Sequence, residues 1–376
     1  MVVQPPFLLG GVAVLTRADL RFDEARLGLS AAAFFAATAA SSIVGGRVAE
    51  RIGPRAGMLL AGGISTACLI AVSLSTSWAM LTAFMAFGGL GNGFGQPAAN
   101  LALARGVAGH RQGLAFGIKQ SAIPVAGIIA GASLPAVGLV FGWRFAFALP
   151  ALGFILVITL TPRFAHTRKP THESRRGDDA ALRPLVVIAI GCMLATMTAQ
   201  SLGVFTVESG VAAGLTPTHA GLLLSGGSLA GIAGRLAAGW LADRREGRHL
   251  VAVSWMLGIG SLGCVLLGVS ATHAAFAVLG TIIGFSLSWG WPGLLFLAVV
   301  RLNPTAPALA TGITQTGGAL GGVFGPLLFG AVVSRSTYQV GWWATAVLSL
   351  LAVGCMLIGR RLLGPPTQRR RKQSWW

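Results

Sequence analysis

Lys119 is the residue of this sequence whose type and position most clearly indicate chemistry. It lies in an apolar stretch over residues 113–140 and follows the loop residue Arg111 by eight positions. A helix would carry it roughly 12 Å beyond that loop, where a lysine is costly unless it meets a partner or water. The apolar stretches contain no Asp or Glu, and only Glu208 comes close to one. We expect an anionic solute as the counter-ion of Lys119; the alternative is that its stem returns the ammonium group to the surface.

Amide side chains form a second set of candidates. Asn92, Gln96 and Asn100 recur at intervals of four in the stretch 78–102, so a helix would place them on one face. Glycines alternate around Asn92, but no strand precedes them, which excludes a nucleotide-binding loop. Polar groups inside an apolar helix need a cavity or a partner. We expect Asn92 and Gln96 to face a solute cavity, with hydrogen bonds between helices as the alternative.

Two further pairs of residues are candidates for contact with a solute. Gln120 and Gln315 occupy equivalent positions in two similar segments, and we expect both to donate hydrogen bonds to the solute. Trp289 and Trp291 lie near the middle of the stretch 274–299, although tryptophan favours the ends of membrane helices. We expect them to shape the cavity, and packing between helices is the equal alternative.

No group of residues indicates a metal site, a cofactor or an enzyme. Each cysteine lies in an apolar stretch without metal-ligand spacing, and the six histidines fall in loops or at the ends of stretches. Catalysis inside a membrane would need paired carboxylates, a histidine cluster or a nucleophile beside a base. The sequence contains none of these at such positions, so we expect a protein that is not an enzyme and has neither a cofactor nor a metal.

The composition requires lipid as the surrounding solvent. The chain is 54% hydrophobic and 10% charged, whereas soluble domains are about 25% charged. A net charge of +18 would suit nucleic acid, but the basic residues cluster in short loops between apolar stretches, as in membrane proteins. We expect an all-α integral membrane protein, monomeric, with the lipid bilayer and a small solute as partners and no nucleic acid.

Eleven apolar stretches are long enough to cross a bilayer, which takes about 20 residues. They cover residues 28–46, 56–75, 78–102, 113–140, 143–161, 184–206, 219–241, 250–269, 274–299, 310–333 and 339–358. A further stretch, Phe7–Leu15, is too short to cross by itself. Placing the loop around Arg51 in the cytoplasm puts 21 of the 28 Lys and Arg residues on that side. This bias predicts a cytoplasmic C-terminus. The excess of arginine over lysine is typical of a GC-rich bacterium, so we expect the protein in a bacterial inner membrane.

An internal repeat organises these stretches. Four short motifs occur twice, in the same order and at offsets of 193–199 residues. The pairs are Gly46–Arg51 with Gly239–Arg244, Gln96–Pro97 with Trp291–Pro292, Gly117–Ser121 with Gly312–Thr316, and Gly142–Trp143 with Gly341–Trp342. Six stretches separate the two members of each pair, so both have the same orientation. The pattern predicts two six-helix halves related by an axis along the membrane normal.

With this repeat, the chain resembles the major facilitator superfamily of secondary transporters over essentially its whole length. The most specific motif of that family is Gly-x-x-x-Asp-Arg-x-Gly-Arg, after the second helix. Its two copies here contain Gly46, Glu50, Arg51, Gly53 and Arg55, and then Gly239, Asp243, Arg244 and Arg248. The first copy has Glu in place of Asp, and the second has one extra residue before its Gly. In the family this motif is a cytoplasmic latch; the alternative is that its arginines only set the topology.

The resemblance implies two pseudo-symmetric six-helix bundles that transport by alternating access. We assign residues 1–162 to the first bundle, 163–183 to a cytoplasmic linker, 184–359 to the second bundle and 360–376 to a basic cytoplasmic tail. Subtracting the repeat offset from Pro184 places the start of helix 1 about ten residues before Met1, so we expect helix 1 to be truncated in this sequence.

Helices 5 and 11 are similar to those of the cyanate- and nitrate-transporter-like branches, which implies a small organic or inorganic anion as the solute. A drug or metabolite efflux antiporter is the alternative, with Lys119 structural. Gly325–Pro326 is similar to an element that family antiporters carry in helix 5, but helix 5 here has no proline directly after Gly131. The direction and the coupling ion stay open: a proton would travel on the solute or use Glu208, and facilitated diffusion needs neither.

Overall fold

The computed structural model describes residues 2–106, 118–160, 182–244, 249–303 and 307–363, and every regular element in these ranges is a helix. The first half contains α1 (Gln4–Gly11), α2 (Ala13–Leu20), α3 (Glu24–Ile52), α4 (Pro54–Ser73), α5 (Trp78–Gly106), α7 (Ala122–Ser133), the π-helix η2 (Leu134–Gly138), α8 (Leu139–Phe141), α9 (Trp143–Ala151) and α10 (Gly153–Leu160). The second half contains α11 (Leu182–Ala212), α12 (Pro217–Arg244), α13 (His249–Gly268), α14 (Ala274–Ser288), α15 (Pro292–Leu302), α16 (Pro307–Val333) and α17 (Tyr338–Leu363).

Among the described residues, nine helical segments are long and apolar enough to cross a membrane, with mean hydropathy between 1.3 and 2.1. They match nine of the eleven predicted stretches. The other two are α5, which is 29 residues long but rich in glycine and amides at its centre, and the segment from Trp143, which is split into α9 and α10. The prediction of an all-α membrane protein is confirmed.

Local sequence explains where several helices begin, end or widen. The Asp23 side chain caps α3 by accepting a hydrogen bond of 2.9 Å from the backbone N–H of Arg26. Gly53 separates α3 from α4 with φ of 86°, which glycine adopts without strain, and Pro54 then occupies the first position of α4. Pro135 lies in the π-helix η2, a wider turn that tolerates its missing N–H.

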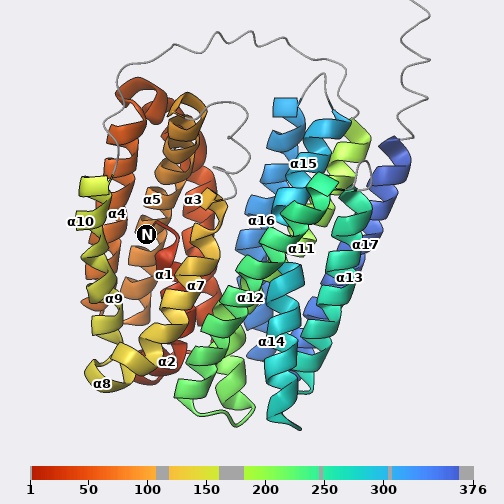
Figure 1. Cartoon of the computed structure of the whole chain (residues 1–376). Coiled ribbons are helices and arrows are strands. Elements are labelled where there is room, and N and C mark those ends of the chain that lie inside the picture. Colours follow the sequence, from red (N-terminus) through yellow and green to blue (C-terminus); the bar gives the residue numbers. More distant parts are fainter. Residues whose placement is uncertain (1, 107–117, 161–181, 245–248, 304–306, 364–376) are drawn as a thin grey trace, which may run out of the picture.

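The two halves repeat each other helix by helix. The helices α4 and α13 both have 20 residues and begin 195 residues apart; α3 and α12 have 29 and 28 residues and begin 193 apart. In Figure 1 the first half, from red to yellow, lies beside the second half, from green to blue. Residues 161–181 and 364–376 lie outside the described ranges, and most of the predicted linker and tail falls there.

The two halves meet at one end of the helices and diverge toward the other (Figure 1). The end that carries Arg47, Arg51 and Arg55 is termed the basic end. The end that carries Arg17 and Glu208 is termed the opposite end. Ser225 of α12 joins the halves through a hydrogen bond of 2.9 Å from its hydroxyl to the backbone oxygen of Ile128 in α7.

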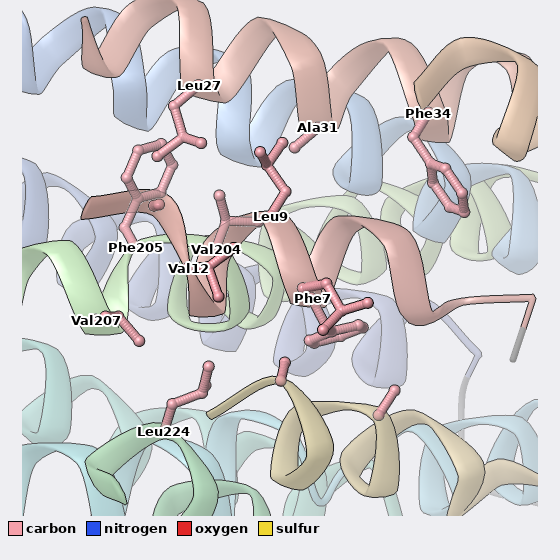
Figure 2. Close-up of a cluster of buried hydrophobic side chains, with 14 of the residues drawn as sticks. Phe7, Leu9, Val12, Leu27, Ala31, Phe34, Val204, Phe205, Val207 and Leu224 are labelled. Atoms are coloured by element: carbon pink, nitrogen blue, oxygen red, sulfur yellow. The ribbon is translucent and has the colours of Figure 1, made fainter. Parts of the chain in front are cut away.

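A buried apolar cluster holds the halves together toward the opposite end (Figure 2). It combines side chains from α1, α3, α11 and α12 with Val12, which lies between α1 and α2; among them are Leu9, Leu27, Val204, Phe205 and Leu224. At its centre α1 and α11 approach backbone to backbone, since a Cβ placed on Gly10 would lie 2.6 Å from the backbone oxygen of Val204. A second cluster, which includes Leu185, Leu250 and Leu295, draws its buried residues from the second half. Of these two clusters, the one that joins the halves therefore lies away from the basic end.

Within each half, helix packing depends on glycines that admit a neighbouring backbone. A Cβ placed on Gly263 of α13 would lie 2.5 Å from the backbone nitrogen of Gly284 and 2.8 Å from the backbone oxygen of Gly280, both in α14. Gly258, on the same helix, would meet nothing nearer than a methyl group of Val353 at 3.9 Å.

We predict that Gly263→Ala lowers the thermal unfolding temperature of the purified protein in detergent. The new methyl group would force α13 and α14 apart, at a cost of about 1–3 kcal/mol. Gly258→Ala is the matched control; it should leave the unfolding temperature unchanged or raise it, because alanine favours the helix. Equal unfolding temperatures for the two variants would contradict the close approach of α13 and α14.

Candidate solute-binding site

The polar side chains of α5 form hydrogen bonds along one face of that helix. The buried Asn92 amide donates to the hydroxyl of Thr38 on α3 at 3.3 Å. Gln96, one turn further along α5, donates to the Asn92 side-chain oxygen at 3.4 Å. The bond from Asn92 to Thr38 joins two helices, as in the alternative to a solute cavity given for these amides in the sequence analysis. The bond from Gln96 holds its half-buried side chain beside Asn92. Thr38 is a member of this network that the sequence did not single out.

Lys119 is half-buried and donates to the side-chain oxygen of Asn100 at 2.8 Å. The partner is an exposed amide of α5, so the ammonium group has a hydrogen-bond acceptor but not an opposite charge there. Among the described residues, no carboxylate forms an ion pair with Lys119. Asn100 thus joins the face of α5 that carries Asn92 and Gln96 to the only lysine of the described chain.

Arg235 of α12 is a second cation inside a membrane helix. Its Nε donates to the backbone oxygen of Trp289 at 2.9 Å, and one terminal nitrogen donates to the backbone oxygen of Gln120 at 2.6 Å. Its guanidinium carbon lies 5.7 Å from the centre of the Trp289 ring, within reach of a cation–π interaction. Arg235 therefore joins the second half to the residue that follows Lys119 in the first half.

Arg235 lies within the predicted stretch 219–241, but it is not among the solute-site residues expected from the sequence. Among the described residues, it too has no carboxylate within ion-pair distance. An arginine in the middle of a predicted span, with no acid one turn away, is the signal that could have identified it as a site residue.

The two tryptophans have different surroundings. Trp289 packs edge-to-face on Phe7 of α1, with ring centres 5.3 Å apart, and its N–H donates to the backbone oxygen of Ala199. It therefore lies where the halves meet. Trp291 is enclosed in the second apolar cluster, and its N–H donates to the backbone oxygen of Ser288 at 2.8 Å. Its side chain therefore packs between helices, which was the alternative to shaping the cavity.

Gln120 enters the site through its backbone oxygen, and its own side chain is half-buried. Gln315 lies on α16 with an exposed side chain. The hydrogen bonds described for Asn92, Gln96, Lys119 and Arg235 do not include Gln315.

The latch motifs lie at the basic end. Glu50 and Arg51 are exposed, and in the described part of the chain they form no ion pair. Arg55 is half-buried, and its Nε has no hydrogen-bond partner among the described residues. Around Gly46 the nearest atom to an added Cβ is a side-chain carbon of Pro97 at 3.9 Å, within the same half.

The second copy of the motif is described in part. Gly239 has open space around it. Asp243 and Arg244 belong to the last turn of α12, and Arg248 lies outside the described residues.

The polar residues of α5, α12 and the segment that begins at residue 118 therefore supply hydrogen-bond donors and cations. An ammonium group, a guanidinium group and two amide groups lie on helices of both halves, and the described carboxylates do not neutralise them. Charged donors of this kind form their strongest hydrogen bonds with carboxylates, phosphates and similar anions. In the described ranges, no group of His, Cys, Asp and Glu could hold a metal ion.

Comparisons with known proteins agree with the helical fold and its internal repeat. The family model described as Major Facilitator Superfamily matches residues 7–207 and, a second time, residues 188–375. The chain is 26% identical over 349 residues to an uncharacterized MFS-type transporter of Mycobacterium tuberculosis, covering 88% of this chain and 77% of that protein. It is 25% identical over 341 residues to the putative niacin/nicotinamide transporter NiaP of Bacillus subtilis, covering 85% and 82%.

A shorter match and a solved structure complete the comparison. The probable nitrate/nitrite transporter NarK2 of Mycobacterium tuberculosis is 31% identical over 151 residues, covering 37% of this chain and 35% of that protein. A bacterial homolog of the human lysosomal transporter Spinster, in an inward-facing and occupied conformation, superposes with a TM-score of 0.75 at 17% identity, covering 96% of this chain and 95% of that one. The match to this structure concerns the fold.

We predict that Arg235→Met raises the thermal unfolding temperature of the ligand-free protein. A guanidinium group removed from water, without a carboxylate, destabilises a protein more than an apolar side chain of similar volume does. Arg360→Met, at the exposed end of α17, is the control and should leave the unfolding temperature unchanged. A clear drop for Arg235→Met alone would mean that its two hydrogen bonds outweigh the cost of burial.

Proposed function

The chain belongs to the Major Facilitator Superfamily, and from that premise we propose that it carries a small organic or inorganic anion across the membrane by alternating access. It is a multi-pass membrane protein and not an enzyme. In this family type, two halves rock against each other around a site near the middle of the membrane. Family membership does not define the substrate class, so the class is inferred from the residues of this chain.

One observation carries the proposal: Arg235 of the second half bonds the backbone oxygen of Gln120, the residue next to Lys119 in the first half, and no described carboxylate pairs with either cation. A bound anion would satisfy both charges, and it would do so by contacting both halves at once. Among the relatives, the probable nitrate/nitrite transporter is named for anions, and the putative niacin/nicotinamide transporter for one acid and its neutral amide.

We assign the other candidates as follows. Lys119 and Arg235 attract the anion, while Asn92, Gln96, Gln120 and Gln315 donate hydrogen bonds to it as the halves move. Trp289 shapes the pocket wall next to Arg235, and Trp291 supports the break between α14 and α15 from within the packed cluster.

We propose that the basic end faces the cytoplasm of a bacterium, with the protein in the inner membrane as a monomer and its C-terminus cytoplasmic. The excess of Lys and Arg at this end supports the orientation. The divergence of the halves toward it then corresponds to an inward-facing state (Figure 1), the state stated for the similar Spinster homolog. The six-helix bundles occupy residues 1–162 and 184–359, joined by 163–183 and followed by the tail 360–376.

The two motif copies act as a cytoplasmic latch in this proposal. In an inward-facing state the latch is released, which suits the exposed Glu50 and the unpaired Nε of Arg55. When the basic end closes, Gly46 and Gly239 would let helices of the two halves approach, because neither has a side chain in the way. Glu50 and Asp243 would then meet arginines or a helix N-terminus of the other half.

A thermal-shift screen in detergent tests the anion assignment. The panel pairs carboxylates with their neutral amides, including nicotinate with nicotinamide, and adds nitrate, nitrite and cyanate, with hydrophobic cations for comparison. A ligand at 100 times its Kd stabilises the folded state by about 2.7 kcal/mol. We expect an anion to raise the unfolding temperature, its neutral partner to have no effect, and Lys119→Ala to remove the shift.

Arg360→Ala, a charge removed from an exposed site, is the matched control and should keep the anion-induced shift. Uptake of the stabilising anion into proteoliposomes should be lost in Lys119→Ala. Stabilisation by hydrophobic cations alone, unaffected by Lys119→Ala, would replace this proposal with the efflux antiporter. Equal stabilisation by a carboxylate and its amide would remove the role of the two cations.

A further inference from the structure

A groove between α12 and α14 lies outside the solute site. It measures about 330 Å³, and every described residue of its wall except His219 is apolar. Leu222 of α12 and Val278 of α14 line it with side chains that are 51% and 44% exposed. Both helices belong to segments that are long and apolar enough to cross the membrane. Lipid is therefore the medium that meets these exposed apolar side chains.

Two neighbouring glycines of α12 form the groove. A Cβ placed on Gly227 would lie 2.5 Å from a methyl carbon of Thr281 in α14, so the two helices touch there. A Cβ placed on Gly226 would meet nothing within 4 Å. The missing side chain of Gly226 thus leaves the space open, and a larger residue at this position would fill the groove without displacing α14.

His219 is the polar residue of the described groove wall, and it belongs to the first turn of α12. Thr216 holds it in place: the threonine hydroxyl accepts a hydrogen bond of 3.3 Å from the backbone N–H of His219 and lies 2.9 Å from Nδ1 of its ring. The other ring nitrogen, Nε2, has no hydrogen-bond partner among the described residues. Nε2 is a donor when Nδ1 accepts from Thr216 and when the ring is protonated.

The register of the two helices places a second histidine at the same level. Gly227 meets Thr281, 54 positions later in the chain, and Gly231, one turn further along α12, meets the residue at the same spacing. That spacing also connects His219 to His273, which directly precedes α14 and is exposed. Both helices therefore begin at the opposite end, each with a histidine beside its first turn (Figure 1).

We propose that this groove binds one acyl chain of a phospholipid, with the phosphate of the same lipid at His219 and His273. An acyl chain matches apolar walls inside the membrane, and the bilayer supplies it in large excess. The phosphate accepts a hydrogen bond from Nε2 of His219, and the N-terminal ends of α12 and α14 favour a negative group at this level. The described wall of the groove contains no carboxylate that would repel the phosphate.

The site is independent of the proposed transport function. Both of its walls belong to the second half, so they move together when the halves rock, and neither the solute nor the direction of transport enters the argument. Failure of the anion screen and failure of this inference are therefore separate results.

Native mass spectrometry of the full chain counts the phospholipids that remain bound. The protein is freed of lipid in a maltoside detergent, whose headgroup carries no phosphate, and is titrated with palmitoyl-oleoyl phosphatidylglycerol. Gly226→Leu should fill the groove and lower the affinity for the tightest-bound lipid roughly tenfold or more, because the acyl chain loses its buried apolar contacts. Val278→Trp, on the other wall, is a second filling variant and should act in the same direction.

Gly354→Leu is the matched control. Gly354 of α17 also has open space around it, but it lies outside the groove, so this variant should bind phosphatidylglycerol as the native protein does. Size-exclusion profiles identify any variant that fails to fold, and the two filling variants then substitute for each other.

A second comparison tests the headgroup. Diacylglycerol with the same two acyl chains lacks the phosphate and should bind more weakly than phosphatidylglycerol. His219→Leu should lower the affinity for phosphatidylglycerol roughly threefold or more, through loss of a hydrogen bond to a charged group. The same variant should leave the affinity for diacylglycerol unchanged, because the groove keeps its apolar walls.

Unchanged affinity in both filling variants would overturn the proposal, as would an equal loss of affinity in Gly354→Leu. Equal binding of phosphatidylglycerol and diacylglycerol would remove the phosphate from the site and overturn the proposal as well. A dimer that dissociates in Gly226→Leu, with lipid binding unaltered, would mean that a second copy of the chain covers the groove in place of a lipid.

Discussion

Lipid offers no hydrogen-bond partners, so each backbone N–H and C=O group within the membrane must find its partner inside the protein. The described chain meets this requirement with helices throughout, and its helix ends coincide with residues that tolerate them, such as Asp23, Gly53 and Pro54. Helices in lipid gain little from burying apolar surface against each other, so their association depends on close approach. The contacts between α13 and α14 at Gly263 and between α1 and α11 at Gly10 are of this kind.

Lipid also makes an unpaired charged side chain within the membrane energetically costly. Lys119 and Arg235 lie within membrane helices, and their described partners are an amide oxygen and two backbone oxygens. These bonds satisfy individual donors but leave the positive charge unneutralised. At the opposite end the balance is reversed, because Arg17 faces both Glu24 and Glu208. Lys119 and Arg235 thus lie beside no described carboxylate, whereas Arg17 alone faces two carboxylates.

The two apolar clusters also differ in whether they join the halves. The buried cluster that joins the halves lies on the side of the Arg17–Glu208 pair, while the second cluster stays within the second half. Motion between the halves can therefore break one cluster and one ion pair without disturbing the packing of the second half around Trp291. In this arrangement Trp289 is in the more sensitive position, because it touches Phe7 of the first half and accepts a hydrogen bond from Arg235 through its backbone oxygen.

The sequence by itself determined the helices, the repeat and the family, because hydropathy, loop charge and repeated motifs are properties of neighbouring residues. It also determined that Lys119 lacks an acid in its span. The tertiary structure decided which polar groups meet: Asn92 bonds to Thr38, Lys119 to Asn100, and Arg235 to the backbone of Gln120 across the halves. It also distinguished Trp289 from Trp291, two positions apart in the sequence but turned toward different neighbours. Partners of this kind lie up to 191 residues apart, as for Arg17 and Glu208; the packing of whole helices brings them together, and no local pattern in the sequence encodes which faces will meet.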